Sequence, residues 1–388
     1  MAELNKELNK ELNKELNKNF GQKLNEEQLE QLAIDLDGVK AKAMEQVGST
    51  DERYIKKVVR QQRSLEIAGR ICLVLGFMSL YFWGVGVLLL SASKILDNME
   101  IGHNVLHGQY DWMNDPTLNS QTFEWDNACS SESWKRVHNY EHHTYTNIVG
   151  KDRDFGYGLL RLSDDFSWRL RNTWQFGTYL VLSTLFQWGI AFHEMAGERV
   201  FFGKKKAGRT SHVDVEQLKK VFYSKSTRQI LKDYVIFPLL AGPFFVMVLL
   251  GNLAANLLRN FWTSTIIFCG HFPTEVYTFT EKECEDESRG HWYYRQILGS
   301  ANLTGPKWFH ILTGHLSCQV EHHLFPEVPA HRYVAMSKEV QVIAAKYGIA
   351  YNTGSFFSQY ASVVQRVIYF SFPVGKVTGK KAALYPRF

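Results

Sequence analysis

Histidines are concentrated in three short segments whose spacing suits a metal site. These segments read His103-Asn-Val-Leu-His107, His138-Asn-Tyr-Glu-His142-His143 and Gln319-Val-Glu-His322-His323. Residues four apart lie on one face of a helix, and histidines at that spacing can share one ion. Imidazole is also the commonest metal ligand near neutral pH. Seven of the fourteen histidines lie here, more than one zinc ion takes, so two metals, or one metal with spare histidines, are implied.

For any one of these segments alone, a polar helix face would be the ordinary explanation. Three segments together favour a metal site instead. In the third segment a helix would place the Gln319 side chain beside both His322 and His323, at spacings of three and four residues.

The order HxxxH, HxxxHH, QxxHH resembles the histidine boxes of the membrane-bound fatty acyl desaturases, which hold a di-iron centre. The third box continues into Leu-Phe-Pro326 and the second into Thr-Tyr-Thr-Asn147, as in many family members. The stretch Lys94-Ile-Leu-Asp-Asn-Met-Glu-Ile-Gly-His103 is similar to the bacterial acyl-CoA desaturase branch. The resemblance covers about residues 67–333.

The resemblance implies a set of iron ligands. They are His103, His107, His138, His142, His143, His271, His322 and His323. His271 lies outside the boxes, where the family has a further ligand, although an interfacial histidine is the alternative. Gln319 stands where some members have a histidine, and it is expected to bind weakly or to hold a water. His315, one turn earlier, is an alternative ligand, but a structural role is favoured for it.

Ligand histidines need a hydrogen bond at the second ring nitrogen. Four acidic residues are near enough in sequence to provide it, without a basis for ranking them: Glu100, Glu141, Asp154 and Glu321. Three interpretations are open for the acidic pair Asp152 and Asp154. The pair orients ligand histidines, contacts a polar lipid headgroup, or belongs to an ordinary solvated loop. The remaining histidines are assigned structural roles: His193, His212, His291, His310 and His331.

Composition narrows the class of protein. The chain has 388 residues, 45% hydrophobic and 14% aromatic, enough for one large domain or two ordinary ones. Its mean hydropathy of −0.23 averages strongly apolar segments with charged ones. A net charge of +5 without a recognisable binding module argues against nucleic acid and fits a basic membrane-facing surface. The five cysteines include no CxxC, which disfavours a disulfide framework or a rubredoxin-type site and favours a reducing compartment.

Two helical hairpins are expected to position the boxes. Residues 71–93 carry no charge, and about 20 apolar residues span a bilayer. Gly84 and Gly86 would allow a reversal, giving two short spans, with Lys94 and Asp97 able to pair. Residues 234–250 and 253–272 form the second pair of spans, with a turn at Gly251-Asn252.

Basic residues around both hairpins place the boxes in the cytoplasm under the positive-inside rule. They are Lys56, Lys57, Arg60, Arg63 and Arg70 before the first hairpin, and Lys204, Lys205, Lys206, Arg209, Lys219, Lys220 and Lys225 before the second. Residues 174–195 are apolar but interrupted, and both of their ends would then be cytoplasmic. We therefore expect an interfacial helix there and not a span. The first sixty residues are polar and show no cleavable signal peptide.

The expected fold is an all-α integral membrane protein with about four transmembrane helices and a cytoplasmic helical cap holding a histidine-rich di-metal site. Residues 1–20 form a low-complexity Glu-Leu-Asn-Lys arm without a catalytic role, and residues 21–66 form cytoplasmic helices. Residues 67–375 form the membrane domain, and residues 376–388 form a basic tail.

The resemblance implies an O2-dependent desaturase with two iron ions that introduces a cis double bond into a long acyl chain, as acyl-CoA or acyl-lipid. Electrons would come from NAD(P)H through an external ferredoxin, rubredoxin or cytochrome b5 with a reductase. The chain itself has no His-Pro-Gly-Gly haem signature, no CxxC and no GxGxxG after a strand. The bilayer is the other partner, in the bacterial inner membrane in preference to the endoplasmic reticulum, with the active site facing the cytoplasm.

Two other functions compete with desaturation. Membrane alkane or lipid hydroxylases use similar boxes, but the hydrocarbon hydroxylases usually add an Asn-Tyr-x-Glu-His-Tyr-Gly stretch, which this chain lacks. A non-enzymatic membrane metal-binding protein should carry its ligands within the spans, whereas here they lie at span ends and beyond. The position of the double bond, the acyl length and the headgroup are not fixed by the sequence.

Overall fold

The computed structural model describes residues 24–203 and 214–374, and helices form most of its regular structure. The one sheet in the described part of the chain pairs β1 (Asn302–Thr304) with β2 (Thr353–Ser355) in parallel. The residue 1–20 arm, the residue 376–388 tail and His212 lie outside the described residues. The expected mainly helical fold is confirmed.

The first helical hairpin carries the first histidine box. Helix α3 (Ser49–Leu75) reverses at residues 76–79 into α4 (Leu80–Ile95). Helix α4 continues through a π-helical segment, η1 (Leu96–His103), into α5 (Asn104–Leu106). The predicted reversal at Gly84 and Gly86 is wrong, because both glycines lie inside α4. A Cβ atom on Gly86 would lie 2.7 Å from the backbone nitrogen of Leu73, so this glycine permits close packing of α4 on α3.

Adding a methyl group at this contact is expected to destabilise the protein. Gly86→Ala should lower the free energy of unfolding by about 1–3 kcal/mol, the usual cost of overpacking, because the α3 backbone must shift. Gly84→Ala is the matched control on the same helix, since a Cβ atom there meets nothing within 4 Å. Thermal unfolding in detergent would measure both variants, and equal midpoints would contradict the close contact.

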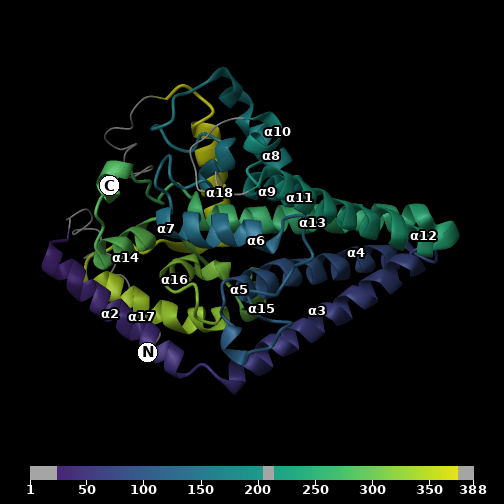
Figure 1. Ribbon diagram of the computed structural model, residues 1–388, viewed down its shortest axis with the longest axis horizontal. Coiled ribbons are helices and arrows are strands. Elements are labelled where there is room, and N and C mark those ends of the chain that lie inside the picture. The colour runs from purple at the N-terminus through teal and green to yellow at the C-terminus, as the bar shows by residue number, and fades with distance from the viewer. Residues whose placement is uncertain (1–23, 204–213, 375–388) are drawn as a thin grey trace.

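The second hairpin leads toward the third box. Helix α11 (Val215–Ile230), π-helical η7 (Leu231–Ile236) and α12 (Phe237–Leu240) form one arm, η8 (Gly242–Phe244) makes the reversal, and α13 (Phe245–His271) returns. The predicted turn at Gly251-Asn252 is wrong, since both residues lie within α13. A Cβ atom on Gly251 would lie 2.4 Å from Leu73 Cδ2 of α3. The two hairpins run side by side toward one end of the molecule (Figure 1).

Two of the described helical stretches are long and apolar enough to cross a membrane, judged by length and composition. They are Leu80–Leu106 and Gly242–His271. Among the described residues, their antiparallel neighbours, α3 and the α11–α12 arm, are not apolar enough over a sufficient length to meet this criterion. The four spans thus stay a prediction.

A buried ion pair joins the two hairpins. Lys94 Nζ on α4 lies 2.7 Å from Asp233 Oδ2 on η7, and Asn256 Nδ2 on α13 donates to the same oxygen at 3.0 Å. Both charged side chains are almost fully buried. The predicted Lys94–Asp97 pair is therefore wrong, and Asp97 instead accepts hydrogen bonds from Asn98 Nδ2 and the Asp126 backbone N–H.

Residues 174–195 are divided between two short helices, α8 (Gln175–Thr184) and α9 (Phe186–Glu194), with a break at Leu185. Neither approaches the length of about 20 residues that a single span needs. Trp174 and Val181 are exposed. The short helices agree with the expectation that this segment is no single span, and its interfacial position stays a prediction.

A cap of helices lies at the opposite end from the hairpin tips (Figure 1). Its core joins Leu32 and Leu36 of α2 to Tyr293 of α14 and Val340 of α17, all buried. The cap and the box-bearing segments comprise α2 (Glu26–Glu45), α6 (Ser131–Trp134), η3 (Lys135–His142), α7 (His143–Tyr145), α14 (Arg289–Leu298), α15 (Lys307–Leu312), η10 (Leu316–Cys318), α16 (Gln319–Leu324), α17 (Tyr333–Lys346) and α18 (Phe356–Tyr369). Smaller elements are η2 (Asp111–Met113), η4 (Phe155–Gly158), η5 (Leu170–Trp174), α10 (Gly197–Phe202), η9 (Glu281–Cys284) and η11 (Ala330–Arg332).

Candidate metal centre

The predicted ligand histidines come from distant segments and meet in the interior. His103 ends η1, His138 and His142 lie in η3, and His143 begins α7. His271 is the last residue of α13, while His322 and His323 lie on α16. The segments η1 and η3 are π-helical, although a regular helix was expected from the spacing. Such turns are frequent at functional sites because they re-aim side chains that a regular helix would place elsewhere.

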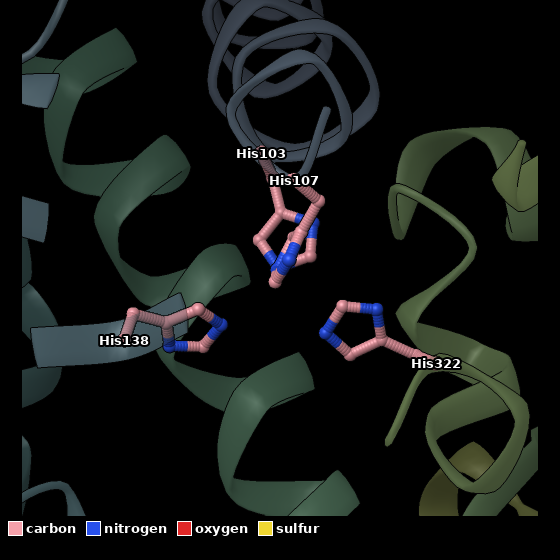
Figure 2. A group of neighbouring side chains, drawn as sticks. All are labelled: His103, His107, His138 and His322. Carbon is pink, nitrogen blue, oxygen red and sulfur yellow. The ribbon is translucent and has the colours of Figure 1, made fainter. Parts of the chain in front are cut away.

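Four histidines form the first group. The rings of His103, His107, His138 and His322 face one another, and one ligand nitrogen from each lies within 4.8 Å of the others (Figure 2). The His103 and His107 ring centroids are 4.7 Å apart, and each is 4.7 Å from the His322 ring. Four imidazole nitrogens at this separation can surround one metal ion.

A second group adjoins the first. His142 Nε2 lies 3.3 Å from His271 Nε2, which lies 3.2 Å from His323 Nε2. His143 lies between the groups, with its ring centroid 4.8 Å from that of His107 and 4.5 Å from that of His323. The structure therefore brings all eight predicted ligand histidines into two neighbouring groups.

Several of these ring nitrogens are buried without a hydrogen-bond partner. They are Nε2 of His103, His107 and His138, and both nitrogens of His143 and His322. Buried polar atoms are rarely left unpaired in native proteins. Their concentration in one place fits a site whose partners are metal ions, so the residues present suit the metal that the boxes predict.

The electrostatics also favour neutral imidazoles, the form that binds metal. Burial lowers the pKa of His138, His143, His322 and His323 below the ordinary value for histidine. Burial acts in the same direction on His142, but the nearby Asp152 carboxylate outweighs it and raises the pKa of that imidazole.

Outer partners fix several ligand rings. His142 Nδ1 lies 3.1 Å from both carboxylate oxygens of Asp152, and His138 Nδ1 lies 3.4 Å from Asp154 Oδ2. These contacts confirm that the acidic pair of the loop faces ligand histidines. Other partners were missed. His103 Nδ1 lies 3.1 Å from Asn104 Oδ1, and His323 Nδ1 lies 3.1 Å from Gln296 Oε1.

Removing the charge at position 152 should weaken metal binding. Asp152→Asn keeps the side-chain shape but loses the carboxylate that accepts from His142, so we expect a fall in metal affinity of about 10–100-fold. Metal retention after chelator titration would measure this effect. Asp115→Asn, in a distant turn, is the control. Equal retention in both variants would show that Asp152 does not support the site.

Three predicted outer partners contact no ligand histidine through a hydrogen bond in the described residues. Glu100 Oε2 lies 2.9 Å from His315 Nδ1, and Tyr54 donates to its other oxygen. Glu321 accepts from Asn302 and Tyr351, and burial raises its pKa to about 7. Burial likewise raises the pKa of Glu141. The expectation for these three carboxylates is therefore wrong as far as hydrogen bonding goes.

The two alternative ligands differ in position. His315 belongs to none of the metal-type groups among the described residues, in agreement with the favoured structural role. The Gln319 amide lies beside the second group, with Nε2 2.9 Å from His271 Nε2. Gln319 Oε1 is buried without a hydrogen-bond partner. Because amide nitrogen and oxygen are assigned from their surroundings, either atom of Gln319 is available to face a metal.

A narrow cavity of about 70 Å³ lies against the histidines. The face of α13 that lines it carries Arg259, Thr263, Ile267 and His271, one every four residues. Arg259 is therefore roughly 18 Å from His271 along the helix axis, at 1.5 Å per residue. Much of the lining is apolar: Met99, Trp125, Trp134, Tyr157, Phe186, Ile190, Phe272 and Leu316. A narrow apolar space of this size suits a small apolar ligand or one end of a long one.

A network of hydrogen-bonded polar side chains lies along α13, at the end of the cavity farthest from His271. Arg259 Nη1 donates to Asn98 Oδ1 of η1 at 2.6 Å, and its other amino group donates to Gln187 of α9. Asn260 Nδ2 donates to the Thr184 carbonyl at 2.9 Å. These bonds tie η1, α9 and α13 together. Arg259 is 2% exposed although it lies in an apolar helix.

Comparisons with known proteins agree with this architecture. The family model for fatty acid desaturase matches residues 78–355. A protein of Mycobacterium tuberculosis named NADPH-dependent stearoyl-CoA 9-desaturase is 39% identical over 354 residues, which cover 90% of this chain and 82% of that protein. The sn-1 linoleoyl-lipid 6-desaturase of Synechocystis is 25% identical over 277 residues, covering 69% and 74% of the two chains. Human fatty acid desaturase 3 is 30% identical over 134 residues, covering 34% and 28%.

Buried histidines that could hold metal lie beside an apolar cavity, as an enzyme acting on an apolar substrate requires, and two long apolar helices indicate membrane association. The chain belongs to the fatty acid desaturase family. It is accordingly an oxidoreductase of lipid metabolism that desaturates fatty acyl chains, which sets aside the hydroxylase and the non-enzymatic alternatives.

Proposed function

We propose that this protein introduces a cis double bond into a long saturated acyl chain carried as acyl-CoA, at a di-iron centre. Two hydrogens leave adjacent carbons, and with two further electrons and two protons they reduce O2 to two waters. The observation that supports this proposal is the convergence of two histidine groups on one wall of an apolar cavity. The M. tuberculosis relative is named for stearoyl-CoA, which supports a thioester substrate.

The two histidine groups supply the proposed ligands. One iron would be held by His103, His107, His138 and His322, and the other by His142, His271 and His323. His143 lies between them and completes either set. Gln319 contributes a weak oxygen ligand or holds a water beside His271. The irons supply the O2-derived oxidising power that no side chain has.

The chain's own residues orient the reactants. Asp152 accepts the Nδ1 proton of His142, which leaves Nε2 directed toward His271. The apolar cavity receives part of the acyl chain, keeps water away and presents its carbons to the ligand-bearing wall. Asn98, Gln187 and Arg259 form a wall at the methyl end of the chain.

For topology, we propose four membrane spans, from α3, α4, the α11–α12 arm and α13, with the cap in the cytoplasm of a bacterial cell. The antiparallel order of each hairpin supports this, because it returns the first box and His271 to the side on which the first helix of each hairpin starts. Lys56 and Lys57 on α3 and Lys219 on α11 supply the positive charge expected on that side.

An external donor delivers the electrons in this proposal. The relative named NADPH-dependent supports NADPH as their source. A ferredoxin, a rubredoxin or cytochrome b5, with its reductase, would carry them to the centre, since the chain contains no carrier motif of its own.

A fatty-acid profile tests the proposed reaction. The protein would be expressed in membranes with a generic electron donor and saturated acyl substrates, and mass spectrometry would locate each new double bond. We expect a new unsaturated acid with the wild type and none with His142→Ala. A hydroxylated product would replace the proposal with hydroxylation. Iron-loaded protein that gives no product with acyl-CoA but desaturates acyl-lipid would overturn the thioester assignment.

A further inference from the structure

A further group of metal-type side chains adjoins the histidine centre and shares Asp154 with it, since Asp154 also lies within reach of His138 and His142. It consists of Asp154, in the loop after the second box, and His193 and Glu194, the last two residues of α9. One ligand atom from each lies within 4.8 Å of the others. A structural role was predicted for His193, and Asp154 lies 39 positions before it in the chain.

The donor atoms of this group are buried and poorly satisfied. Glu194 is 1% exposed and Asp154 is 6% exposed. Glu194 Oε2 has no hydrogen-bond partner. His193 Nε2 and Asp154 Oδ1 lie 3.2 Å apart but lack hydrogen-bond geometry. Three converging side-chain atoms without good hydrogen-bond partners form a site in which a cation would be stabilised.

Charged groups of both signs surround Glu194. The charged groups acting most strongly on Glu194 are Asp154, Arg153, Glu141 and Arg136. With Glu194 itself these are three carboxylates and two guanidiniums, while burial raises the pKa of the Glu194 carboxyl. Arg153 donates through Nη2 to the His193 backbone carbonyl at 2.9 Å.

We propose that Asp154, His193 and Glu194 bind one divalent first-row metal ion, such as Zn²⁺ or Mn²⁺, in addition to the irons of the histidine groups. One imidazole with two carboxylates is a familiar ligand set for such ions, and a water completes the coordination. Asp154 Oδ1 faces this ion, while Oδ2 lies 3.4 Å from His138 Nδ1. The ion thus fixes α9 against the loop and holds the carboxylate that orients His138.

The competing explanation needs no metal. In it, a protonated His193 pairs with the Asp154 carboxylate, and Glu194 stays protonated. Only the metal-bound explanation predicts an additional metal equivalent and an X-ray absorption edge at this position. Neither measurement depends on whether the enzyme desaturates acyl chains.

Metal analysis of the purified protein distinguishes them. After dialysis against a mild chelator, we expect the wild type to retain one metal equivalent more than His193→Gln and Glu194→Gln. His291→Gln, at a surface histidine bonded to Ser288, is the matched control and should match the wild type. Unchanged metal content in folded His193→Gln protein would overturn the proposal. If His103→Ala also lost iron, the proposed histidine centre would be supported and only the Asp154–His193–Glu194 site would be rejected.

Anomalous diffraction from wild-type crystals gives a second test that needs no substitution. We expect an anomalous peak between Asp154 and Glu194, separate from those at the histidine groups, and the absorption edge identifies the element. Density for water or no density there, in protein that carries metal at the histidine groups, would overturn the proposal even if both variants failed to fold.

Discussion

His322→Ala is expected to abolish desaturation and to release metal from both histidine groups. His322 is fully buried, and its ring nitrogens approach those of the first group and also those of His143 and His323. Removing it takes a ligand from the first group and leaves a cavity against the second. Loss of an outer partner alone typically costs about 10–100-fold in metal affinity or activity, so loss of a shared ligand should cost more.

Metal content by mass spectrometry and product formation would be measured on the same preparation. His310→Ala is the control, because this buried histidine bonds to Ser317 and belongs to neither group. It should keep its metal even if it loses stability. A His322→Ala protein with full metal content and full activity would show that this histidine is not a ligand.

Thr263→Phe is expected to shift the enzyme toward shorter acyl chains. Thr263 lies on the cavity-lining face of α13, one turn from Arg259 and two turns from His271. A phenyl ring there fills space that the methyl end of a long chain would occupy in the proposed complex. Because one methylene in an apolar pocket changes discrimination by about 10–200-fold, the longest chains should be rejected most strongly.

The measurement is a competition among saturated acyl-CoA substrates of different length, with double bonds located by mass spectrometry. Leu258→Phe adds a ring on an exposed part of the same helix and should leave the distribution unchanged. In the proposed complex, the distance of the double bond from the carboxyl end is set between the headgroup and the histidine groups, so it should stay the same in both variants. An unaltered chain-length distribution in Thr263→Phe would place the methyl end elsewhere.

The histidine centre was predictable because its spacing is local. Each box places its own ligands within one or two helical turns, so His103 and His107, or His142 and His143, identify themselves in the sequence. The positions of the two reversals were not predictable in the same way. Gly86 and Gly251 both pack on Leu73 of α3, and a glycine between apolar runs serves a turn or a close helix contact equally well.

The outer contacts of the site depended on the fold. Gln296 reaches His323 from another helix, and Arg259 meets Asn98 across 161 positions of the chain. The residue spacing within a single helix cannot predict contacts between side chains of different helices. The acidic pair at Asp152 and Asp154 was a partial exception, since contact with ligand histidines was one of three interpretations left open for this loop.

Lys94 is synthesised long before the carboxylate that neutralises it. Asp233 follows 139 positions later, so α4 leaves the ribosome without its partner. A lone lysine at the centre of a bilayer costs about 2.5–3.5 kcal/mol on insertion scales. In the proposed four-span topology, we therefore expect the nascent first hairpin to lie near the membrane surface until η7 is synthesised and pairs with Lys94. A chain truncated before Asp233 would keep that exposed charge, a mark by which membrane proteases could distinguish unfinished copies from complete ones.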